Sequence, residues 1–258
     1  NGALIAAGAV PVPVPVDDEG MVVAQGRDMA PAARMAFVSP SHQYPLGVTM
    51  TLRRRLELLD WARSANAFIL EDDYDSEYRY AGRPLAAMQG LDEDGRILYV
   101  GSFSKVMFPG LRIGYIVVPK PLVPAFRAIR TLLDSHPSSL PQAALADFIA
   151  DGYLTAHIRR MRALYAARQA IMLAAFPPGL LDLAPHDTGM HLVGLLPDDC
   201  DDVMVSQRIA AAGIIAPPLS TYYRGAAHRR GLLLGYAGVT EPEIRTGVAR
   251  IAEVLAGI

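Results

Sequence analysis

Short runs of apolar residues, separated by helical segments, are the feature that most constrains the fold of this chain. Three of these runs, 67–70, 97–100 and 113–118, contain almost no polar residue. Strands with apolar side chains on both faces are typical of a parallel sheet that helices cover on both sides. We therefore expect an α/β fold, in which a mostly parallel central sheet is flanked by helices, for the first part of the chain.

The second part of the chain has a different pattern, in which helical segments outnumber strand-like runs. Helical periodicity occurs at 122–133, 140–150, 153–176, 203–212 and 241–256, and strand-like runs occur at 190–196 and 231–236. This change of pattern predicts two domains. A large domain is expected over residues 1–150, and a smaller α+β domain over residues 151–258.

Acidic residues stand where the first of the apolar runs should end. The sequence there is Glu-Asp-Asp at 71–73, followed by Tyr74. Ligands of open α/β sheets bind beyond the carboxyl ends of the strands, so these acids are candidates for a binding site. Residues two apart in a strand face the same side, so Asp72 and Tyr74 should share one face and Asp73 should point away. Taken alone, such a group of acids could equally be a solvated strand end.

A lysine, two serines and an arginine follow the second apolar run. Lys105 lies among small, polar and apolar residues, and a partly desolvated amine in such a loop is nucleophilic towards a carbonyl group. The planar guanidinium of Arg112 suits bidentate phosphate binding, and Ser102 and Ser104 can add hydroxyl donors. Together they provide an amine that can bind an aldehyde and, beside it, a binding site for a phosphate group. Pyridoxal phosphate requires both.

Several motifs of the chain resemble one family. The segments 71–80, 101–105 and 109–115 resemble the aminotransferase domain of MocR-type regulators of the GntR family. The segments 39–47 and 157–162 are similar to the same family, so the resemblance covers essentially the whole chain. It implies the fold of type I pyridoxal-phosphate-dependent enzymes.

The resemblance implies a role for each polar residue of these loops. Lys105 would bind the cofactor covalently, Asp72 would pair with the pyridine nitrogen, and Tyr74 would contact the ring oxygen. The residues that would hold the phosphate are Ser102, Ser104 and Arg112. Tyr44 stands where aminotransferases commonly carry an asparagine against the ring oxygen, and His42 is either a further cofactor contact or a loop histidine.

One position departs from the aminotransferase pattern. The arginine that holds the substrate α-carboxylate usually lies two residues before the glycine of the last strand, and here that position is Leu233. Arg229 or Arg230 either replaces it as a substrate-binding residue or is simply solvated. Because a buried carboxylate without a cationic partner is costly, Leu233 predicts slow or absent transamination of common α-amino acids.

The resemblance implies a domain that senses an amine or amino-acid effector through pyridoxal phosphate, within a transcription regulator. The alternative is a free-standing aminotransferase that acts on α-amino acids, and a third possibility is a scaffold that has lost the cofactor. The family further implies a homodimer and an upstream winged helix-turn-helix. The chain is therefore expected to be truncated at its N-terminus, and to contact DNA only through that missing part. Its net charge of −2 fits this expectation, since DNA-binding surfaces usually carry a basic excess.

The other polar residues indicate no further chemistry. Five of the six histidines, all except His42, lack metal-ligand spacing and are expected to be structural, and no metal is expected. No apolar run is long enough to span a membrane. The single cysteine, Cys200, lies among aspartates that should raise the pKa of its thiol. One cysteine and the lack of a signal peptide predict a cytoplasmic location.

Overall fold

The computed structural model describes residues 2–82 and 85–257, which divide into two compact units. The first unit comprises residues 2–43, 48–74 and 85–148, and the second comprises residues 44–47, 75–82 and 149–257. Each unit has its own hydrophobic core. The segment 44–47 belongs to the second unit although it lies far from the rest of that unit in the sequence.

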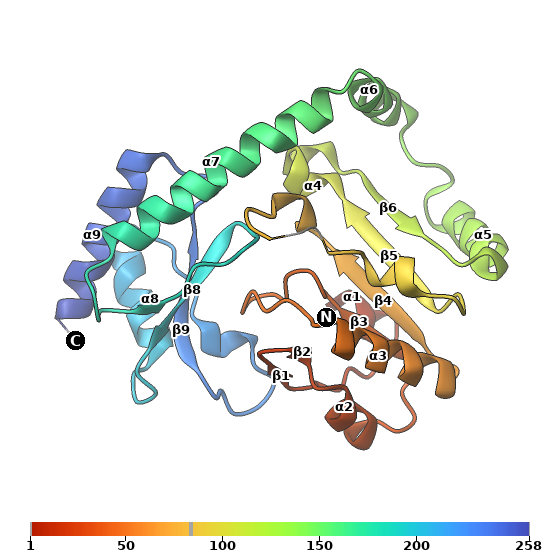
Figure 1. Ribbon diagram of the computed structural model, residues 1–258, viewed down its shortest axis with the longest axis horizontal. Helices are drawn as coiled ribbons and strands as arrows, with labels where there is room; N and C mark the ends of the chain where they lie inside the picture. Colours follow the sequence, from red (N-terminus) through yellow and green to blue (C-terminus); the bar gives the residue numbers. More distant parts are fainter. Residues whose placement is uncertain (1, 83–84, 258) are drawn as a thin grey trace. The chain divides into compact units, whose positions relative to one another are not determined.

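A four-stranded sheet of order β3-β4-β5-β6 forms the centre of the first unit (Figure 1). Its strands are β3 (Met35–Val38), β4 (Phe68–Asp73), β5 (Ile97–Ser102) and β6 (Gly114–Val117). The first three are parallel, whereas β6 runs antiparallel to β5 and is exposed along its whole length. The expectation of a buried strand in a parallel sheet at 113–118 was therefore wrong. The connection from β5 holds only a four-residue helix and a 3-10 turn, too short for the crossover that a parallel strand needs.

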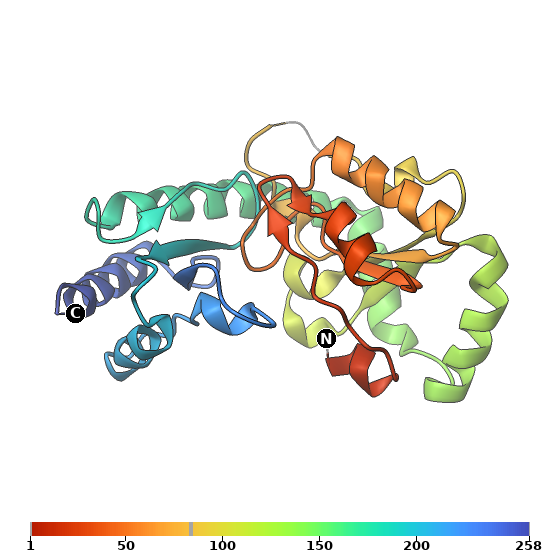
Figure 2. The same cartoon turned by 90° about the horizontal axis from the view of Figure 1, so that it is seen from below.

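Helix α3 (Leu52–Ser64) covers one face of this sheet (Figure 2). The core between helix and sheet includes Leu58, Trp61, Ile69 and Ile97. Because alternate residues of a strand face the same side, Glu71 and Asp73 share this covered face with Ile69. Asp72 faces the other side of the sheet.

The remaining elements of the first unit are short or lie at its edges. They are α1 (Gly2–Ala6), β1 (Val16–Asp17), β2 (Gly20–Met21), α2 (Val23–Met29), η2 (Met88–Leu91), α4 (Phe103–Val106), η3 (Pro109–Leu111), η4 (Lys120–Leu122) and α5 (Val123–Asp134). Helix α6 (Ser139–Ala150) contains the sequence boundary between the two units. The segment rich in valine and proline at 9–16 forms no regular element before Val16, so it is a connector.

The second unit is built on a three-stranded antiparallel sheet of order β7-β8-β9 (Figure 1). Its strands are β7 (Asp182–Leu183), β8 (His191–Leu196) and β9 (Arg230–Gly235). Its helices are η1 (Ser76–Tyr78), α7 (Tyr153–Ala175), α8 (Asp202–Ala211), η5 (Leu219–Tyr222) and α9 (Glu241–Ala256). The helices predicted from periodicity in this part of the sequence are all present, with ends that differ by at most one residue.

The two faces of the small sheet have different cores. Leu192 and Leu232 lie in the large core that α7, α8 and α9 share. Val193 and Leu233 have the opposite parity, and they form a smaller cluster with Leu219 of η5. Leu233 is 5% exposed, so the side chain at the centre of β9 is enclosed by apolar neighbours on the face without long helices.

A buried arginine of α3 organises the loops beside the large sheet. Arg55 is 3% exposed, and its Nε donates to the carbonyl oxygen of Met50 at 2.9 Å. Its two terminal nitrogens donate to the carbonyl oxygens of Ala86, at 2.7 Å, and Pro40, at 2.9 Å. One guanidinium therefore joins both ends of the loop 40–50 to the segment that precedes η2.

Glu71 has a similar tethering role on β4. Its carboxylate oxygens accept hydrogen bonds from the backbone N–H groups of Met88, at 2.8 Å, and Gln89, at 2.9 Å. Burial raises the pKa of the Glu71 carboxyl group, and these two hydrogen bonds oppose the rise. Glu71 thus holds the start of η2, a contact that the run of acids in the sequence did not indicate.

The substitution Arg55→Met is expected to lower the free energy of unfolding by about 3 kcal/mol or more, because the three hydrogen bonds that the buried guanidinium donates to backbone carbonyl oxygens are lost. Urea denaturation followed by circular dichroism would measure this loss. Arg63→Met is the matched control, since Arg63 lies on the same helix, is exposed and pairs only with Asp60 in an i,i+3 ion pair. Equal effects of the two substitutions would contradict the tethering role of Arg55.

Candidate functional site

Seven of the ten predicted site residues lie in the first unit, and three lie in the second. The first unit holds His42, Asp72, Tyr74, Ser102, Ser104, Lys105 and Arg112. The second unit holds Tyr44, Arg229 and Arg230. The chemistry of each group is therefore described within its own unit.

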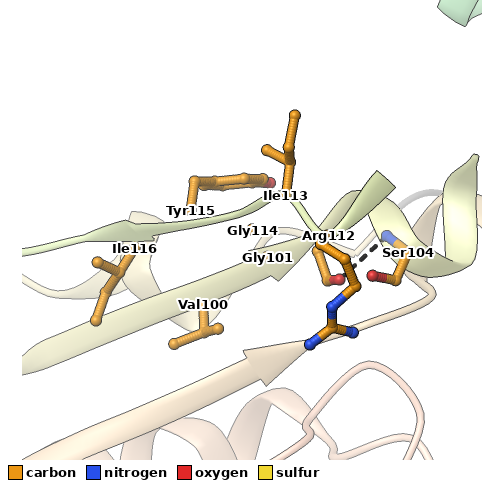
Figure 3. Close-up of a pocket in the computed structure, with 9 residues that line it drawn as sticks. Val100, Gly101, Ser104, Arg112, Ile113, Gly114, Tyr115 and Ile116 are labelled. Atoms are coloured by element: carbon orange, nitrogen blue, oxygen red, sulfur yellow. Dashed lines mark hydrogen bonds between the residues drawn. The ribbon is translucent and has the colours of Figure 1, made fainter. Parts of the chain in front are cut away.

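Three of these residues line one pocket of the first unit, at the end of β5. Ser102, Ser104 and Arg112 surround a space of about 450 Å³. The guanidinium of Arg112 points to the same side of the sheet as Val100, whereas the ring of Tyr115 lies on the other side (Figure 3). Ser102 Oγ accepts a hydrogen bond of 3.2 Å from the backbone N–H of Ser104, so its hydroxyl hydrogen can still be donated to a ligand. Two hydroxyl groups and a guanidinium make a receptor for an anion.

The backbone of Arg112 has an unusual conformation. Its φ of 53° and ψ of 36° lie in the left-handed region, which only a few per cent of residues other than glycine adopt. This turn joins η3 to β6 and directs the guanidinium into the pocket. Backbone strain of this kind concentrates at ligand sites, and its presence here supports a binding role for Arg112.

Close packing also limits the residues that can stand beside the pocket. A Cβ atom on Gly101 would lie 2.3 Å from the Tyr115 ring, and one on Gly114 would lie 3.1 Å from the carbonyl oxygen of Gly101. Any side chain at Gly101 would therefore displace Tyr115. The glycines of β5 and β6 thus allow the two strands to approach closely at the pocket, a requirement that the sequence motif alone did not explain.

The two neighbouring aspartates of β4 have different surroundings. Asp73 is buried on the face that α3 covers, and its carboxylate accepts a hydrogen bond of 2.7 Å from the Tyr99 hydroxyl group. Burial, and then the Asp73 carboxylate, raise the pKa of Tyr99, which stays a neutral donor. Asp72 is half-buried on the opposite face and pairs in register with Val100, which lines the pocket. Only Asp72 is directed to the side where a ligand of the pocket would lie.

Tyr74 and His42 form one hydrogen-bonded group. The Tyr74 hydroxyl donates to the carbonyl oxygen of His42 at 2.9 Å, and it lies 3.1 Å from His42 Nδ1. His42 is almost completely buried. These contacts favour a role for His42 in holding Tyr74. They account for a buried histidine at this position without a direct contact to the cofactor.

Lys105 lies in the short helix α4, on the turn that follows β5. Its side chain is exposed, and it follows directly after Ser104, which lines the pocket. An exposed amine at this place is accessible to a small molecule. The turn that carries the lysine is capped by Ser102, so the amine and the pocket belong to one local structure.

The arginines of the second unit have unequal surroundings. Arg230 Nη1 lies 3.7 Å from the carboxylate of Asp202, which is fully buried. The same carboxylate accepts hydrogen bonds from the backbone N–H and hydroxyl groups of Ser220 and from the N–H of Gly231. Arg229 is exposed. This arrangement favours a structural role for Arg230 and leaves Arg229 as the more accessible cation.

Tyr44, the third predicted site residue of this unit, has a partner that the sequence did not indicate. Its hydroxyl group lies 3.0 Å from that of Tyr222, which is 178 residues away in the sequence. Burial raises the pKa of Tyr44 to about 12, with a further contribution from Tyr222. The Tyr44 hydroxyl group therefore remains neutral near pH 7.

Other kinds of site find no support in the described part of the chain. Within residues 2–82 and 85–257, no three histidine, cysteine or acidic side chains are grouped so that they could hold a metal ion. No helix in those ranges is long and apolar enough to cross a membrane. Burial and the neighbouring aspartates raise the pKa of Cys200, as expected.

Comparison with known proteins gives consistent results. The model of the family described as aminotransferase class I and II matches residues 6–251. The chain is 43% identical to the probable rhizopine catabolism regulatory protein MocR of Rhizobium meliloti, over 96% of this chain and 50% of that protein. It is 29% identical to aromatic-amino-acid aminotransferase 1 of Thermococcus litoralis, over 95% of this chain and 61% of that protein. The crystal structure of Pyrococcus horikoshii kynurenine aminotransferase superposes with a TM-score of 0.86 at 29% identity, covering 95% of this chain and 63% of that one. The chain spans about half the length of the regulators that it matches.

The opposite directions of the two aspartates lead to a test by matched substitutions in the complete protein. Asp72→Asn is expected to weaken the binding of pyridoxal phosphate about tenfold or more, since a charge-assisted hydrogen bond is lost. Asp73→Asn keeps an amide oxygen that can accept from Tyr99, so the affinity should stay within about twofold. Titration of the cofactor by absorbance would measure both affinities. A larger loss in Asp73→Asn than in Asp72→Asn would refute the assignment of Asp72.

Proposed function

Because this chain belongs to the class I and II aminotransferase family, whose cofactor is pyridoxal phosphate, we propose that it is the effector-sensing domain of a MocR-type transcription regulator. The observation that carries the proposal is the 43% identity to a regulator over nearly the whole chain. Identity to an aminotransferase enzyme over a similar length is 29%. In this proposal the domain reads a small molecule instead of turning it over.

The residues of the first unit fit the cofactor chemically. Ser102, Ser104 and Arg112 offer two hydroxyl donors and a guanidinium to a phosphate group. Asp72, on the adjoining strand, offers a carboxylate to a protonated pyridine nitrogen. Lys105, which follows the pocket residue Ser104 in the sequence, offers a primary amine. When bound, pyridoxal phosphate supplies an aldehyde for amines and an electron-withdrawing ring.

Each of these residues has a separate task in the proposed function. Lys105 would hold the cofactor through its primary amine, and the bound cofactor would supply an aldehyde that an amine of the effector can reach. Asp72 keeps the proton on the pyridine nitrogen. Tyr74, whose hydroxyl group is held by the carbonyl oxygen of His42, would contact the ring oxygen. Arg112 and the two serines fix the phosphate end, so that the ring cannot rotate out of place.

The surroundings of Leu233 favour sensing over turnover. The side chain is enclosed by Val193 and Leu219, and the nearby Arg230 faces the buried carboxylate of Asp202. An α-carboxylate needs a cation or several N–H donors where it is buried, and neither is offered at this position of β9. A free-standing aminotransferase remains the alternative, which the structural likeness to kynurenine aminotransferase favours, and Arg229 would then be its carboxylate ligand.

The proposal extends to the partners of the complete protein. Regulators that this chain matches are about twice as long, so the complete protein is proposed to carry a winged helix-turn-helix upstream. It would bind an operator as a homodimer in the cytoplasm, and take an amine or amino acid as its effector. DNA contact would be confined to the upstream domain, since this chain carries a net charge of −2.

A covalent cofactor link is expected at Lys105. Borohydride reduction of the complete, cofactor-loaded protein, followed by peptide mass spectrometry, should find the pyridoxyl group on this residue. Lys120 is the internal control, because it lies outside the pocket at the start of η4. A pyridoxyl group on Lys120, or on no lysine despite bound cofactor, would overturn the assignment.

The complete protein should bind DNA and should convert common α-amino acids slowly or not at all. Gel-shift assays at several salt concentrations would test the first expectation, with a falling affinity at high salt. Rapid-mixing absorbance with a panel of amino acids would test the second. Fast conversion of several amino acids, abolished by Arg229→Ala, would favour the enzyme and assign its carboxylate ligand. Arg230→Ala is the matched variant.

A further inference from the structure

A cluster of side chains in the first unit is centred on Tyr115, whose ring lies on the side of the sheet opposite to Arg112 (Figure 3). The ring of Tyr115 lies 6.1 Å from that of Tyr99 and 5.7 Å from that of Phe103, measured between centroids, and both pairs are tilted. Aromatic rings attract each other at such distances. The Tyr99 hydroxyl group in turn donates to the carboxylate of Asp73 at 2.7 Å. The cluster therefore joins β4, β5, the start of α4 and β6.

Phe103 connects this cluster to the turn that carries the candidate cofactor lysine. It is the first residue of α4, and Lys105 lies two residues further on. Its two neighbours in the sequence, Ser102 and Ser104, both line the pocket. The backbone N–H of Phe103 donates to the carbonyl oxygen of Ile113 at 3.0 Å, just before β6 begins. A contact that holds the Phe103 ring therefore fixes the start of the helix that carries the amine.

Tyr99 and Asp73 connect the cluster to the end of β4. Burial, and then Asp73, raise the pKa of Tyr99, and a hydrogen bond with Tyr115 adds to this rise. Tyr99 is therefore a neutral donor that links the other two side chains. Because neighbouring residues of a strand face opposite sides, a hydrogen bond that fixes Asp73 on one side also fixes Asp72 on the other.

The ring of Tyr115 occupies the space beside a glycine. Gly101 pairs in register with Asp73 on one side and with Tyr115 on the other. A Cβ atom on Gly101 would lie 2.3 Å from the Tyr115 ring, so the ring takes the place of a side chain there. Tyr115 is 43% exposed and lies on the edge strand of the sheet. A ring this exposed buries little apolar area, so its contacts with the cluster account for it better than core packing does.

We propose that Tyr115 is a positioning residue, whose ring holds the lysine turn and the end of β4 in the arrangement that pyridoxal phosphate requires. Through Phe103 the ring fixes the start of α4, and through Tyr99 and Asp73 it fixes the strand that carries the candidate pyridine partner. The proposal rests on the proposed function, because it concerns the same cofactor. It adds a side chain that the sequence motif did not assign to the site.

The test uses the complete protein loaded with pyridoxal phosphate and follows the absorbance of the cofactor as the pH is varied. The midpoint of this titration depends on where the amine of Lys105 stands relative to the cofactor ring. Tyr115→Leu is expected to move the midpoint by about half a pH unit or more. It should also weaken cofactor binding about tenfold. Tyr115→Phe keeps the ring and should restore the midpoint, with an affinity within about twofold of the wild type.

Two further variants separate positioning from general packing. Phe108→Leu is the matched control, since Phe108 is an aromatic residue of the same connection between β5 and β6 and is 53% exposed. It should change neither the midpoint nor the affinity. Gly101→Ala should displace the Tyr115 ring and reproduce the shift, and it should add little more in combination with Tyr115→Leu. Gly101→Ala also tests the proposal if Tyr115→Leu yields too little folded protein.

The outcomes distinguish this proposal from the proposed function. A lower melting temperature of Tyr115→Leu without a change in the midpoint would overturn the positioning role, since the ring would then serve stability alone. An equal shift in Phe108→Leu, or a double variant whose shift is the sum of the two single shifts, would also overturn it. A wild-type protein that takes up no pyridoxal phosphate would instead overturn the proposed function, and the positioning role with it.

Discussion

A buried guanidinium is the contact on which the arrangement of the first unit depends. Arg55 loses its hydration inside the protein, and it is accommodated because each of its three side-chain nitrogen atoms donates to a backbone carbonyl oxygen. Those carbonyl groups close the loop 40–50, which carries His42, and the carbonyl oxygen of His42 holds Tyr74. The position of a candidate cofactor contact therefore depends on a charged side chain that touches no ligand. Glu71 acts in the same way on η2, so two buried charges shape the loops around an otherwise apolar sheet.

Much of the fold could be predicted because its periodic patterns are long and clear. Helix α9 begins and ends at the predicted residues, β5 contains the predicted run 97–100, and β4 begins one residue after the start of the predicted run 67–70. The direction and exposure of β6 could not be predicted in this way, since composition does not reveal whether the connection between two strands is long enough for parallel pairing. The short connection from β5 decides how β6 pairs. Its helical turns are too short to give a periodic pattern in the sequence.

The site was predictable to a different degree in the two units. Alternation along β4 separated Asp72 from Asp73, and sequence proximity alone joined Ser102, Ser104 and Arg112 in one pocket. The partners of Tyr44 and Arg230 could not be found, because Tyr222 and Asp202 become neighbours only through folding. Short-range patterns therefore identify residues that line one pocket, whereas contacts such as that between Tyr44 and Tyr222 join distant parts of the chain.

The alternation along β4 also makes the number of residues in the strand part of its chemistry. Glu71 and Asp73 must lie on the face under α3, because their hydrogen-bond donors, the backbone N–H groups of η2 and the Tyr99 hydroxyl group, are on that face. Asp72 must lie on the opposite face of the sheet. A single inserted or deleted residue would exchange these faces and leave one carboxylate in the apolar core. A single substitution in β4 therefore changes one side chain, whereas a change in its length disturbs all three carboxylates at once. Relatives should place their insertions and deletions in the loops that lead into β4 and never inside it.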